Sequence, residues 1–362
     1  MKETIGIGII GTGFARTTQL PAFRACTGAR VVAIASGHRA NAEAVAREFD
    51  IPNVADGWRE VVARPDVDLV SIVTPPVTHA EIALAVLDAG KAVLCEKPMA
   101  MNAAETDAMR QRAAQAQALA LVDHELRLLA GRQRLRARLH AGEIGRVRHI
   151  RFRYSADSRA SATRAWDWWS DERAGGGVLG AIGSHAVDAC RWLLDAEVTN
   201  VCAQLVTHVS ERPDERTGEL RKVTTDDEAN LLLRFTDGSL TAGTTGTISL
   251  SMVESGQMEH SLALYGERGA LMIAEPEELF RAEPGAGAWQ RIKFTPTPIA
   301  RGMRDGSWSR GFTVFACEIV KALRAGRNTV AHAAAFADGH RAQLVLDAAR
   351  RSHERGCWVS VK

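Results

Sequence analysis

Two side chains in the sequence are candidates for proton chemistry, and Lys97 is the first. It follows a short apolar run at residues 92–95 and precedes Pro98, which restricts it to an extended backbone. A short continuous apolar run is typical of a buried parallel strand, and ligands bind at the carboxyl ends of such strands. Lys97 is therefore predicted to project from a sheet edge, where it would polarise a reacting oxygen. A solvated turn lysine is the alternative.

The second candidate is His185, within the run GGGVLGAIGSHAVD at residues 175–188. Its three leading glycines let the backbone pass close to another group, and a helical pattern follows. An imidazole near the start of that helix would face the cleft, with Ser184 beside it. A lone histidine on such a face is more often a buried structural residue.

Three indoles just before this run are candidates for substrate binding: Trp166, Trp168 and Trp169. Indoles stack on the apolar face of a sugar ring while neighbouring carboxylates accept hydroxyl protons. A hydrophobic plug between two domains is an equal alternative. Arg164 and Arg173 either select an acidic substrate or pair with Asp167 and Glu172.

A glycine-rich turn near the N-terminus is positioned to bind a dinucleotide. Isoleucines at 5, 7, 9 and 10 predict a strand that runs into Gly11-Thr12-Gly13-Phe14-Ala15-Arg16. A literal GxGxxG match at Gly6, Gly8 and Gly11 lies inside this strand, so we treat it as a decoy. At Gly11 the chain turns from strand to helix, where free N–H groups can meet a pyrophosphate. A plain strand-to-helix turn is the alternative.

The end of the next predicted strand, residues 31–35, indicates which dinucleotide binds. An NAD site usually carries Asp or Glu there for the ribose hydroxyls, whereas this chain has Ser36-Gly37-His38-Arg39. Donors and positive charge suit a 2′-phosphate, so NADP is favoured and NAD stays possible. A surface loop with an incidental arginine is the alternative.

Further cofactor candidates follow the later strands of the predicted sheet. These are Thr74, Pro75, Pro76, His79, Glu96 and Lys97, of which Glu96 would orient Lys97 or the nicotinamide ribose. His79 stands at a helix start, where a capping or structural role is the first interpretation.

Length and composition predict a two-domain protein acting on a small molecule. The 362 residues exceed what one core usually supports, and a net charge of +2 with dispersed Lys and Arg favours neither nucleic acid nor membrane as a partner. We expect a cytoplasmic protein, because no signal sequence or membrane span is evident. The six cysteines lack metal-ligand spacing and are expected to be reduced, mostly buried side chains, with no metal bound.

Several motifs together resemble the glucose-fructose oxidoreductase, inositol dehydrogenase and MocA family. They are GIIGTGF, IVTPP with His79, VLCEKP, GGGVLGAIGSHAVD, and Asp338-Gly339 followed by QLVLDAARRS. The resemblance implies an α/β fold with an N-terminal Rossmann domain, a doubly wound parallel sheet, at residues 1–123. It also implies an α/β domain at 124–362 with a large, mostly antiparallel sheet whose open face forms a homodimer or homotetramer. The family motif assigns His185 the role of general acid/base, but often has Asp where this chain has Ala181.

Together these features predict an NADP-dependent oxidoreductase that moves hydride between nicotinamide and a secondary alcohol or carbonyl of a sugar, cyclitol or related small polar molecule. Lys97 would hold the reacting oxygen and His185 would transfer its proton. Two alternatives stay open. One is a glycoside hydrolase that oxidises its substrate transiently with a retained NAD(P), and the other is a cofactor-sensing regulator without turnover.

Overall fold

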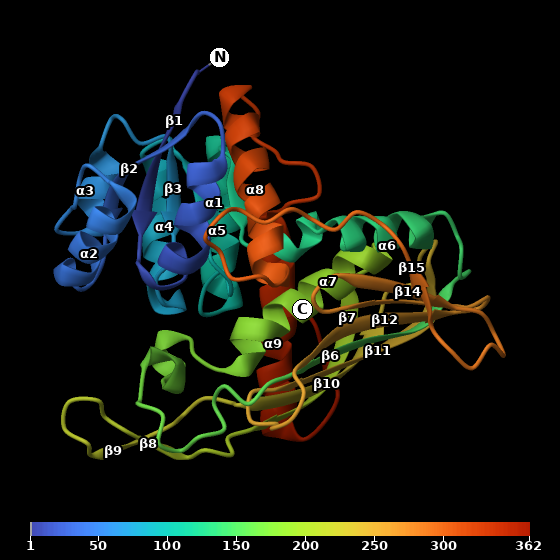
Figure 1. Ribbon diagram of the computed structural model, residues 1–362. Helices are drawn as coiled ribbons and strands as arrows, with labels where there is room; N and C mark the ends of the chain where they lie inside the picture. The colour runs from blue at the N-terminus through green and yellow to red at the C-terminus, as the bar shows by residue number, and fades with distance from the viewer. Residues whose placement is uncertain (1) are drawn as a thin grey trace. The chain divides into compact units, whose positions relative to one another are not determined.

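The computed structural model describes residues 2–362, and these divide into two compact units (Figure 1). The first unit comprises the chain up to residue 129 together with residues 297–340, and the second comprises residues 130–296 and 341–362. The sequence analysis expected a single boundary after residue 123. A helix far along the chain joins the first unit instead, because its apolar face packs against the N-terminal helices. No helix of the described residues is long and apolar enough to cross a bilayer.

A six-stranded sheet forms the centre of the first unit, in the order β16-β5-β4-β3-β1-β2. All its pairs are parallel except β16 with β5. Its strands are β1 (Ile5–Ile10), β2 (Ala29–Ala35), β3 (Leu69–Ile72), β4 (Ala92–Cys95), β5 (Ala120–Val122) and β16 (Ala334–Ala335). Four of them, β1, β3, β4 and β5, are buried along their whole length, as their continuous apolar runs predict.

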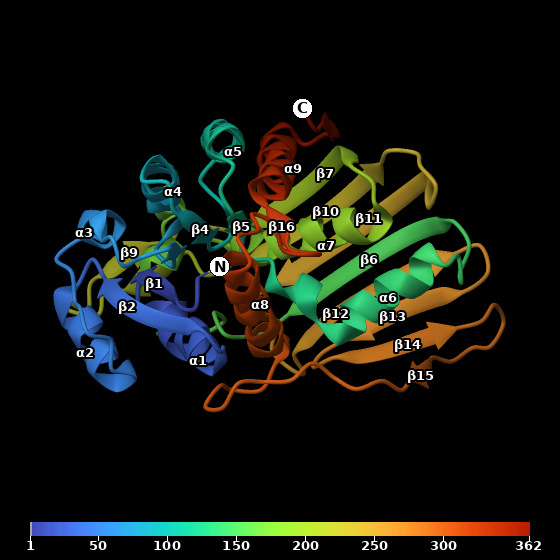
Figure 2. The same cartoon turned by 90° about the horizontal axis from the view of Figure 1, so that it is seen from above.

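Helices cover both faces of this sheet, which confirms the doubly wound prediction (Figure 2). The helical elements are η1 (Ala15–Gln19), α1 (Leu20–Ala25), α2 (Arg39–Phe49), α3 (Trp58–Ala63), η2 (Pro76–Thr78), α4 (His79–Asp88), α5 (Ala103–Ala116), η3 (Glu125–Leu128) and α8 (Ser307–Arg324). α1, α2 and α8 share one apolar core, and α3, α4 and α5 share the other.

Contacts between α1 and α8 fasten the distant segment to this unit. Phe312 meets Phe23 edge-on with ring centroids 5.6 Å apart. Cys26 and Cys317 are joined in a disulfide across 291 positions of sequence. The expectation that all cysteines are reduced is therefore wrong for this pair, because the packing of α8 on α1 brings together two residues that sequence spacing does not relate. Cys95, Cys190, Cys202 and Cys357 are free thiols.

The second unit is built on a nine-stranded sheet in the order β15-β14-β13-β12-β6-β11-β10-β7-β17. Only β6 and β11 pair in parallel, which confirms a mostly antiparallel sheet. Its strands are β6 (Val147–Ser155), β7 (Val198–Val206), β10 (Glu228–Phe235), β11 (Thr241–Ser251), β12 (Glu259–Gly266), β13 (Ala270–Ala274), β14 (Glu278–Ala282), β15 (Gln290–Ile292) and β17 (Val359–Ser360).

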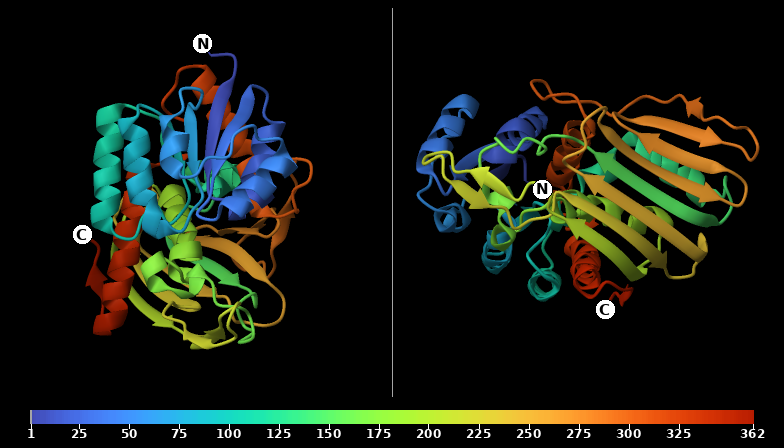
Figure 3. Two further views of the ribbon diagram at one scale, coloured as in Figure 1. Left: turned by 90° about the vertical axis from the view of Figure 1, so that its left-hand side faces the viewer. Right: turned by 90° about the horizontal axis from the view of Figure 1, so that it is seen from below.

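Helices lie on one face of this second sheet and leave the other face open. Figure 2 shows α6 (Ala130–His140) and α7 (Ser184–Leu194) over the strands, and the right-hand view of Figure 3, seen from below, shows the strands uncovered. The remaining elements are η4 (Trp168–Ser170), η5 (Glu172–Ala174), η6 (Leu179–Gly183), α9 (Phe336–Arg355) and the hairpin β8 (Glu211–Pro213) and β9 (Leu220–Lys222). That hairpin is mostly exposed apart from Arg212.

Candidate active site

The glycine turn after β1 has the geometry of a phosphate cradle. Gly11 has φ +104°, and a Cβ there would lie 2.3 Å from the carbonyl oxygen of Val73, so only glycine fits. Gly13 is exposed, and its Cβ position has no heavy atom within 4 Å, which leaves room for a ligand to approach the backbone. Thr12, Phe14 and Ala15 lead from this turn into η1.

The earlier glycines have a different role. Gly6 and Gly8 lie inside β1, where a Cβ would come within 1.8 Å of the Asp66 carbonyl oxygen and 2.4 Å of a Val61 methyl carbon. Their small size serves packing against neighbouring chain segments. The interpretation of the literal GxGxxG match as a decoy is confirmed.

The segment Ser36 to Arg39 lies at the carboxyl end of β2 with three of its four residues exposed. Arg39 does not stand alone there. Its guanidinium bonds the carboxylates of Glu43, at 2.9 Å, and Asp56. Ser36 Oγ accepts a hydrogen bond from the His38 amide at 3.3 Å. A phosphate at this position would therefore have to draw Arg39 from two exposed carboxylates.

His79 ties together the segments that follow β3 and β4. Its ring is fully buried, with Nε2 2.8 Å from the Thr74 carbonyl oxygen and Nδ1 3.1 Å from that of Pro98. Burial lowers the pKa of His79, so the neutral ring donates to one of these carbonyls at neutral pH. The structural interpretation of His79 fits this geometry. Pro75 and Pro76 continue the Thr74 segment into η2.

Glu96 and Lys97 follow β4 at the carboxyl edge of the sheet, where Gly11 follows β1. Glu96 is 7% exposed, and its Oε2 accepts a hydrogen bond from the Lys97 backbone amide at 3.3 Å. Lys97 is half-buried. The two residues thus occupy the place where the sheet topology predicts ligand chemistry.

A buried carboxyl network surrounds this position, and sequence analysis missed it. Gln19 donates from Nε2 to Glu96 Oε1 at 3.1 Å and to Asp123 Oδ2 at 3.2 Å, while its Oε1 accepts from Ser71 Oγ at 2.6 Å. Asp123 and Glu125 follow β5, and both are at most 1% exposed. The strand-end argument that selected Lys97 applies equally to these two residues and would have found them.

Two carboxyl groups of the network, those of Asp123 and Glu125, have raised pKa values. Burial raises the pKa of Asp123 well above its usual value, and the charge of Glu125 and a hydrogen bond with Glu96 add to this. Burial, together with the charge of Glu96, raises the pKa of Glu125 to about 8. The Lys97 ammonium acts in the opposite sense on both groups. The Lys97 ammonium is therefore electrostatically coupled to the carboxyl groups of Asp123 and Glu125.

In the second unit, His185 occupies the second position of α7 and is 2% exposed, beside the equally buried Ser184. Close packing explains the glycines before it. A Cβ on Gly176 would lie 2.2 Å from the Trp169 carbonyl oxygen, and one on Gly177 would lie 2.5 Å from Asp226 Oδ1. Asp226 in turn accepts from the Leu179 amide at 2.6 Å at the start of η6. The prediction of close backbone approach is confirmed.

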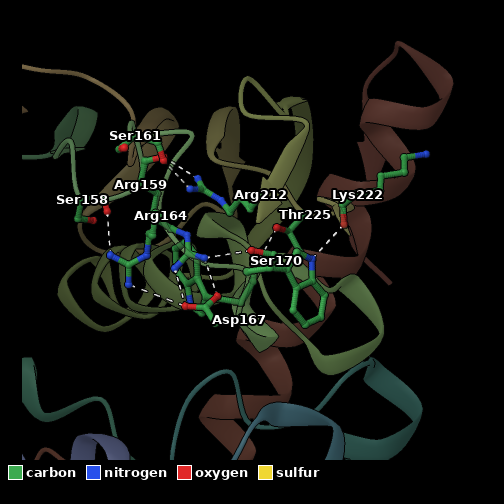
Figure 4. Close-up of polar contacts among 11 residues, drawn as sticks. Ser158, Arg159, Ser161, Arg164, Asp167, Ser170, Arg212, Lys222 and Thr225 are labelled. Carbon is green, nitrogen blue, oxygen red and sulfur yellow. Dashed lines mark hydrogen bonds and ion pairs between the residues drawn. The ribbon is translucent and has the colours of Figure 1, made fainter. Parts of the chain in front are cut away.

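The loop that carries Trp166, Trp168 and Trp169, which we call the tryptophan loop, packs on the β8–β9 side of the second unit (Figure 4). Arginines cover two of its indoles: the Arg221 guanidinium carbon is 3.4 Å from the Trp166 ring centroid, and that of Arg159 is 4.5 Å from the Trp169 centroid. Trp168 is 41% exposed. Only Trp168 therefore offers an open aromatic face among the three.

Arginines also organise the polar side of this loop. Arg159 bonds Asp167 at 2.6 Å and Arg164 lies 3.8 Å from the same carboxylate. The buried Arg212 donates to the carbonyl oxygens of Arg159 and Ser161 (Figure 4). Arg164 thus pairs with Asp167, as the alternative to selecting an acidic substrate predicted. Arg173 pairs with Asp171 at 3.4 Å instead of Glu172.

Comparison with known protein families agrees with this geometry. Residues 5–124 match a model described as oxidoreductase family, NAD-binding Rossmann fold, and residues 132–272 match the GFO/IDH/MocA C-terminal domain. The chain belongs to the GFO/IDH/MocA oxidoreductase family. It is accordingly an oxidoreductase, and the two matched segments correspond to the parallel and the antiparallel sheet.

Members of this family resemble the chain along its full length. Levoglucosan dehydrogenase of Pseudarthrobacter phenanthrenivorans is 28% identical over 394 residues, covering 99% of this chain and 98% of that protein. Glucose-fructose oxidoreductase domain-containing protein 2 of Xenopus laevis is 30% identical, covering 100% and 95%. A solved structure of levoglucosan dehydrogenase in complex with NADH and L-sorbose aligns with a TM-score of 0.88 at 27% identity, over 99% of each chain.

Proposed function

We propose that this oxidoreductase transfers hydride between a nicotinamide dinucleotide, NADP in preference to NAD, and a secondary alcohol or carbonyl carbon of a sugar or related small polar molecule. The observation that carries the proposal is the shared sheet edge in the first unit. The open glycine cradle follows β1, and Lys97, set in its buried carboxyl network, follows β4 at that edge.

The residues present fit a dinucleotide. The free backbone at Gly13 suits a pyrophosphate, and the segments at 36–39 and 74–76 follow β2 and β3 at the same edge. When bound, the nicotinamide supplies the hydride acceptor or donor. Thr12 to Ala15 would hold the pyrophosphate, since Arg16 is paired with Glu48, and Glu96 would orient Lys97 through its backbone amide.

Lys97 has the role of binding and polarising the reacting oxygen. An ammonium beside a developing alkoxide stabilises the charge that appears in the transition state. Burial raises the pKa values of Asp123 and Glu125, which reduces the negative charge near that ammonium. His185 has the role of general acid/base, which the family motif at 175–188 supports.

The relative free energies of the interactions open to Arg39 support the preference for NADP. Arg39 is bound by Glu43 and Asp56, but both pairs are exposed, and such pairs contribute about 0–1 kcal/mol each. A charge-assisted hydrogen bond to a 2′-phosphate contributes roughly 1.5 to 3 kcal/mol. The phosphate would therefore win the competition for Arg39, with His38 and Ser36 as further donors.

A sugar-like substrate is supported by the relatives and by one side chain. The solved structures include levoglucosan dehydrogenase with NADH and levoglucosan, at 26% identity to this chain. In this chain, Trp168 presents an exposed indole of the kind that stacks on a sugar ring. Trp166 and Trp169, already stacked by arginines, would shape the loop instead of touching substrate.

The test is a screen of NAD and NADP against sugars, cyclitols and their keto forms, levoglucosan and L-sorbose included, following the absorbance of the reduced cofactor. Net reduction in step with substrate loss is expected. Hydrolysis of a glycoside without net reduction would replace this proposal with the hydrolase alternative. Absence of any turnover despite cofactor binding would favour the regulator.

The open face of the nine-stranded sheet is proposed as the homodimer or homotetramer interface. Leu232 of β10 is 49% exposed, between Leu231 and Leu233, which are each 1% exposed. We expect light scattering to report at least a dimer for the wild type and a smaller species for Leu232→Glu. A monomeric wild type would overturn this assignment.

A further inference from the structure

The first unit contains a cavity whose lining includes none of the residues Gly11 to Ala15 of the glycine cradle. Its volume is about 810 Å³, within the range of sites that bind metabolite-sized molecules. Residues of η1, α1, the last turn of α2 and the segment 301–304 line it. Figures 1 and 2 show the orange segment that precedes α8 passing beside α1.

Positive charge dominates the lining of this cavity, which we call the arginine cavity. Four arginines contribute to it, Arg16, Arg24, Arg301 and Arg304, against a single carboxylate, Glu48. Glu48 is bonded to Arg16 at 2.6 Å. Within residues 2–362, neither Arg301 nor Arg304 makes a hydrogen bond or ion pair, so their guanidinium donors are available to a ligand.

The arginine cavity is separate from the expected 2′-phosphate position. α2 begins at Arg39, beside the end of β2, and ends at Phe49, which lines the cavity. At 1.5 Å rise per residue, these two ends are about 15 Å apart. Arg16, expected in the cofactor site, reaches toward Glu48 instead of the segment at 36–39.

We propose that the arginine cavity binds a small phosphorylated organic molecule. Guanidinium groups form bidentate bonds with phosphate oxygens, and the two unpaired arginines would supply them. The ring faces of Phe49 and Pro21 offer apolar surface to the organic part of the ligand. Glu48 opposes the ligand's charge and competes with it for Arg16.

The experiment is a calorimetric titration of inorganic pyrophosphate into the full-length protein already saturated with NADP, so that the dinucleotide site is filled. The double variant R301Q/R304Q is expected to bind at least tenfold more weakly. E48Q is expected to bind severalfold more tightly, because it removes the opposing charge and frees Arg16. This increase in affinity cannot arise from misfolding.

The matched control is R47Q. Arg47 is exposed on α2 one residue before Glu48, lies outside the lining of the cavity, and forms no ion pair among residues 2–362. Unchanged binding by R47Q supports the proposal. Equal losses in R47Q and R301Q/R304Q would show diffuse attraction to a basic surface and overturn it. No detectable binding to the wild type at millimolar pyrophosphate would also overturn it. So would a cavity that is occupied by a second copy of the chain instead of a small molecule.

Discussion

Glu125 shows how burial determines the chemistry of a single residue. Its pKa is raised to about 8 by desolvation and by the charge of Glu96, against the opposing effect of Lys97. Such a carboxyl group is protonated at neutral pH beside a half-buried lysine. The sequence places both residues after strands, but only the packing of α8 explains why Glu125 is shielded from water. A Cβ on Gly311 of α8 would lie 2.7 Å from the Glu125 carbonyl oxygen.

We predict that Glu125→Gln flattens the dependence of stability on pH. Because the folded pKa is raised, the contribution of this group to stability is complete below its unfolded pKa near 4.5 and is lost as pH rises through about 8. The expected slope is at most about 1.4 kcal/mol per pH unit over that range. Asp123, shifted in the same direction, retains part of the slope.

The measurement is the melting temperature between pH 5 and pH 9. Glu354→Gln, an exposed substitution of the same type on α9, is the control and should follow the wild type. Parallel curves for Glu125→Gln and the wild type would show that Glu125 is ionised in the folded protein at neutral pH.

Cofactor preference is a second residue-scale prediction. Asp56→Asn releases Arg39 from one carboxylate, so NADP should bind about two- to fivefold more tightly while NAD binding stays unchanged. Arg39→Ala should erode the preference for NADP at least tenfold. Calorimetric titration of both dinucleotides checks this, and equal or tighter binding of NAD by the wild type would refute the phosphate assignment.

At the scale of elements, the sequence predicted the helices, strands and turns that are determined by the order of neighbouring residues. The strand-to-helix turn at Gly11, the strands at 31–35 and 92–95 and the helix that contains His185 could all be predicted from neighbouring residues. Strands β13 to β15 were missed. They are short: β13 is a mostly buried apolar run without strict alternation, and β14 and β15 are largely outside the core.

Long-range pairings could not be predicted from the sequence in the same way. Nothing in the spacing of Cys26 and Cys317 reveals that α8 packs on α1. The partners of the tryptophans were equally hidden, because Arg221 reaches Trp166 from β9 and Arg159 reaches Trp169 from the segment after β6. Exposed Trp168 was indistinguishable from its neighbours in sequence.

The disulfide between Cys26 and Cys317 is predicted to stabilise the first unit. It closes a long loop between α1 and α8, so its loss should destabilise the first unit by roughly 2–5 kcal/mol. A reducing agent should therefore lower the melting temperature of the wild type and leave the Cys26→Ala/Cys317→Ala variant unaffected. Thiol labelling of both cysteines in the native protein without reductant, with no effect of reductant on melting, would contradict the bond.

At the scale of the whole molecule, the proposed reaction assigns two groups to one substrate. Lys97 would polarise the reacting oxygen and His185 would transfer its proton. Groups that act on one substrate in one transition state have strongly non-additive effects when removed. His185→Asn should lower turnover by about two orders of magnitude and remove an ionisation from the pH profile, and Lys97→Met/His185→Asn should be little slower than the slower single variant. Additive losses would indicate independent roles.

The most direct test of the central claim is a comparison of cofactor binding and turnover in Lys97→Met, measured by titration of NADP and by the absorbance of reduced cofactor with the best sugar of the screen. If Lys97 polarises the reacting oxygen, NADP affinity should stay within about threefold of wild type while turnover falls by roughly two or more orders of magnitude. Wild-type turnover in Lys97→Met would contradict the account and return Lys97 to the role of a solvated residue at a strand end.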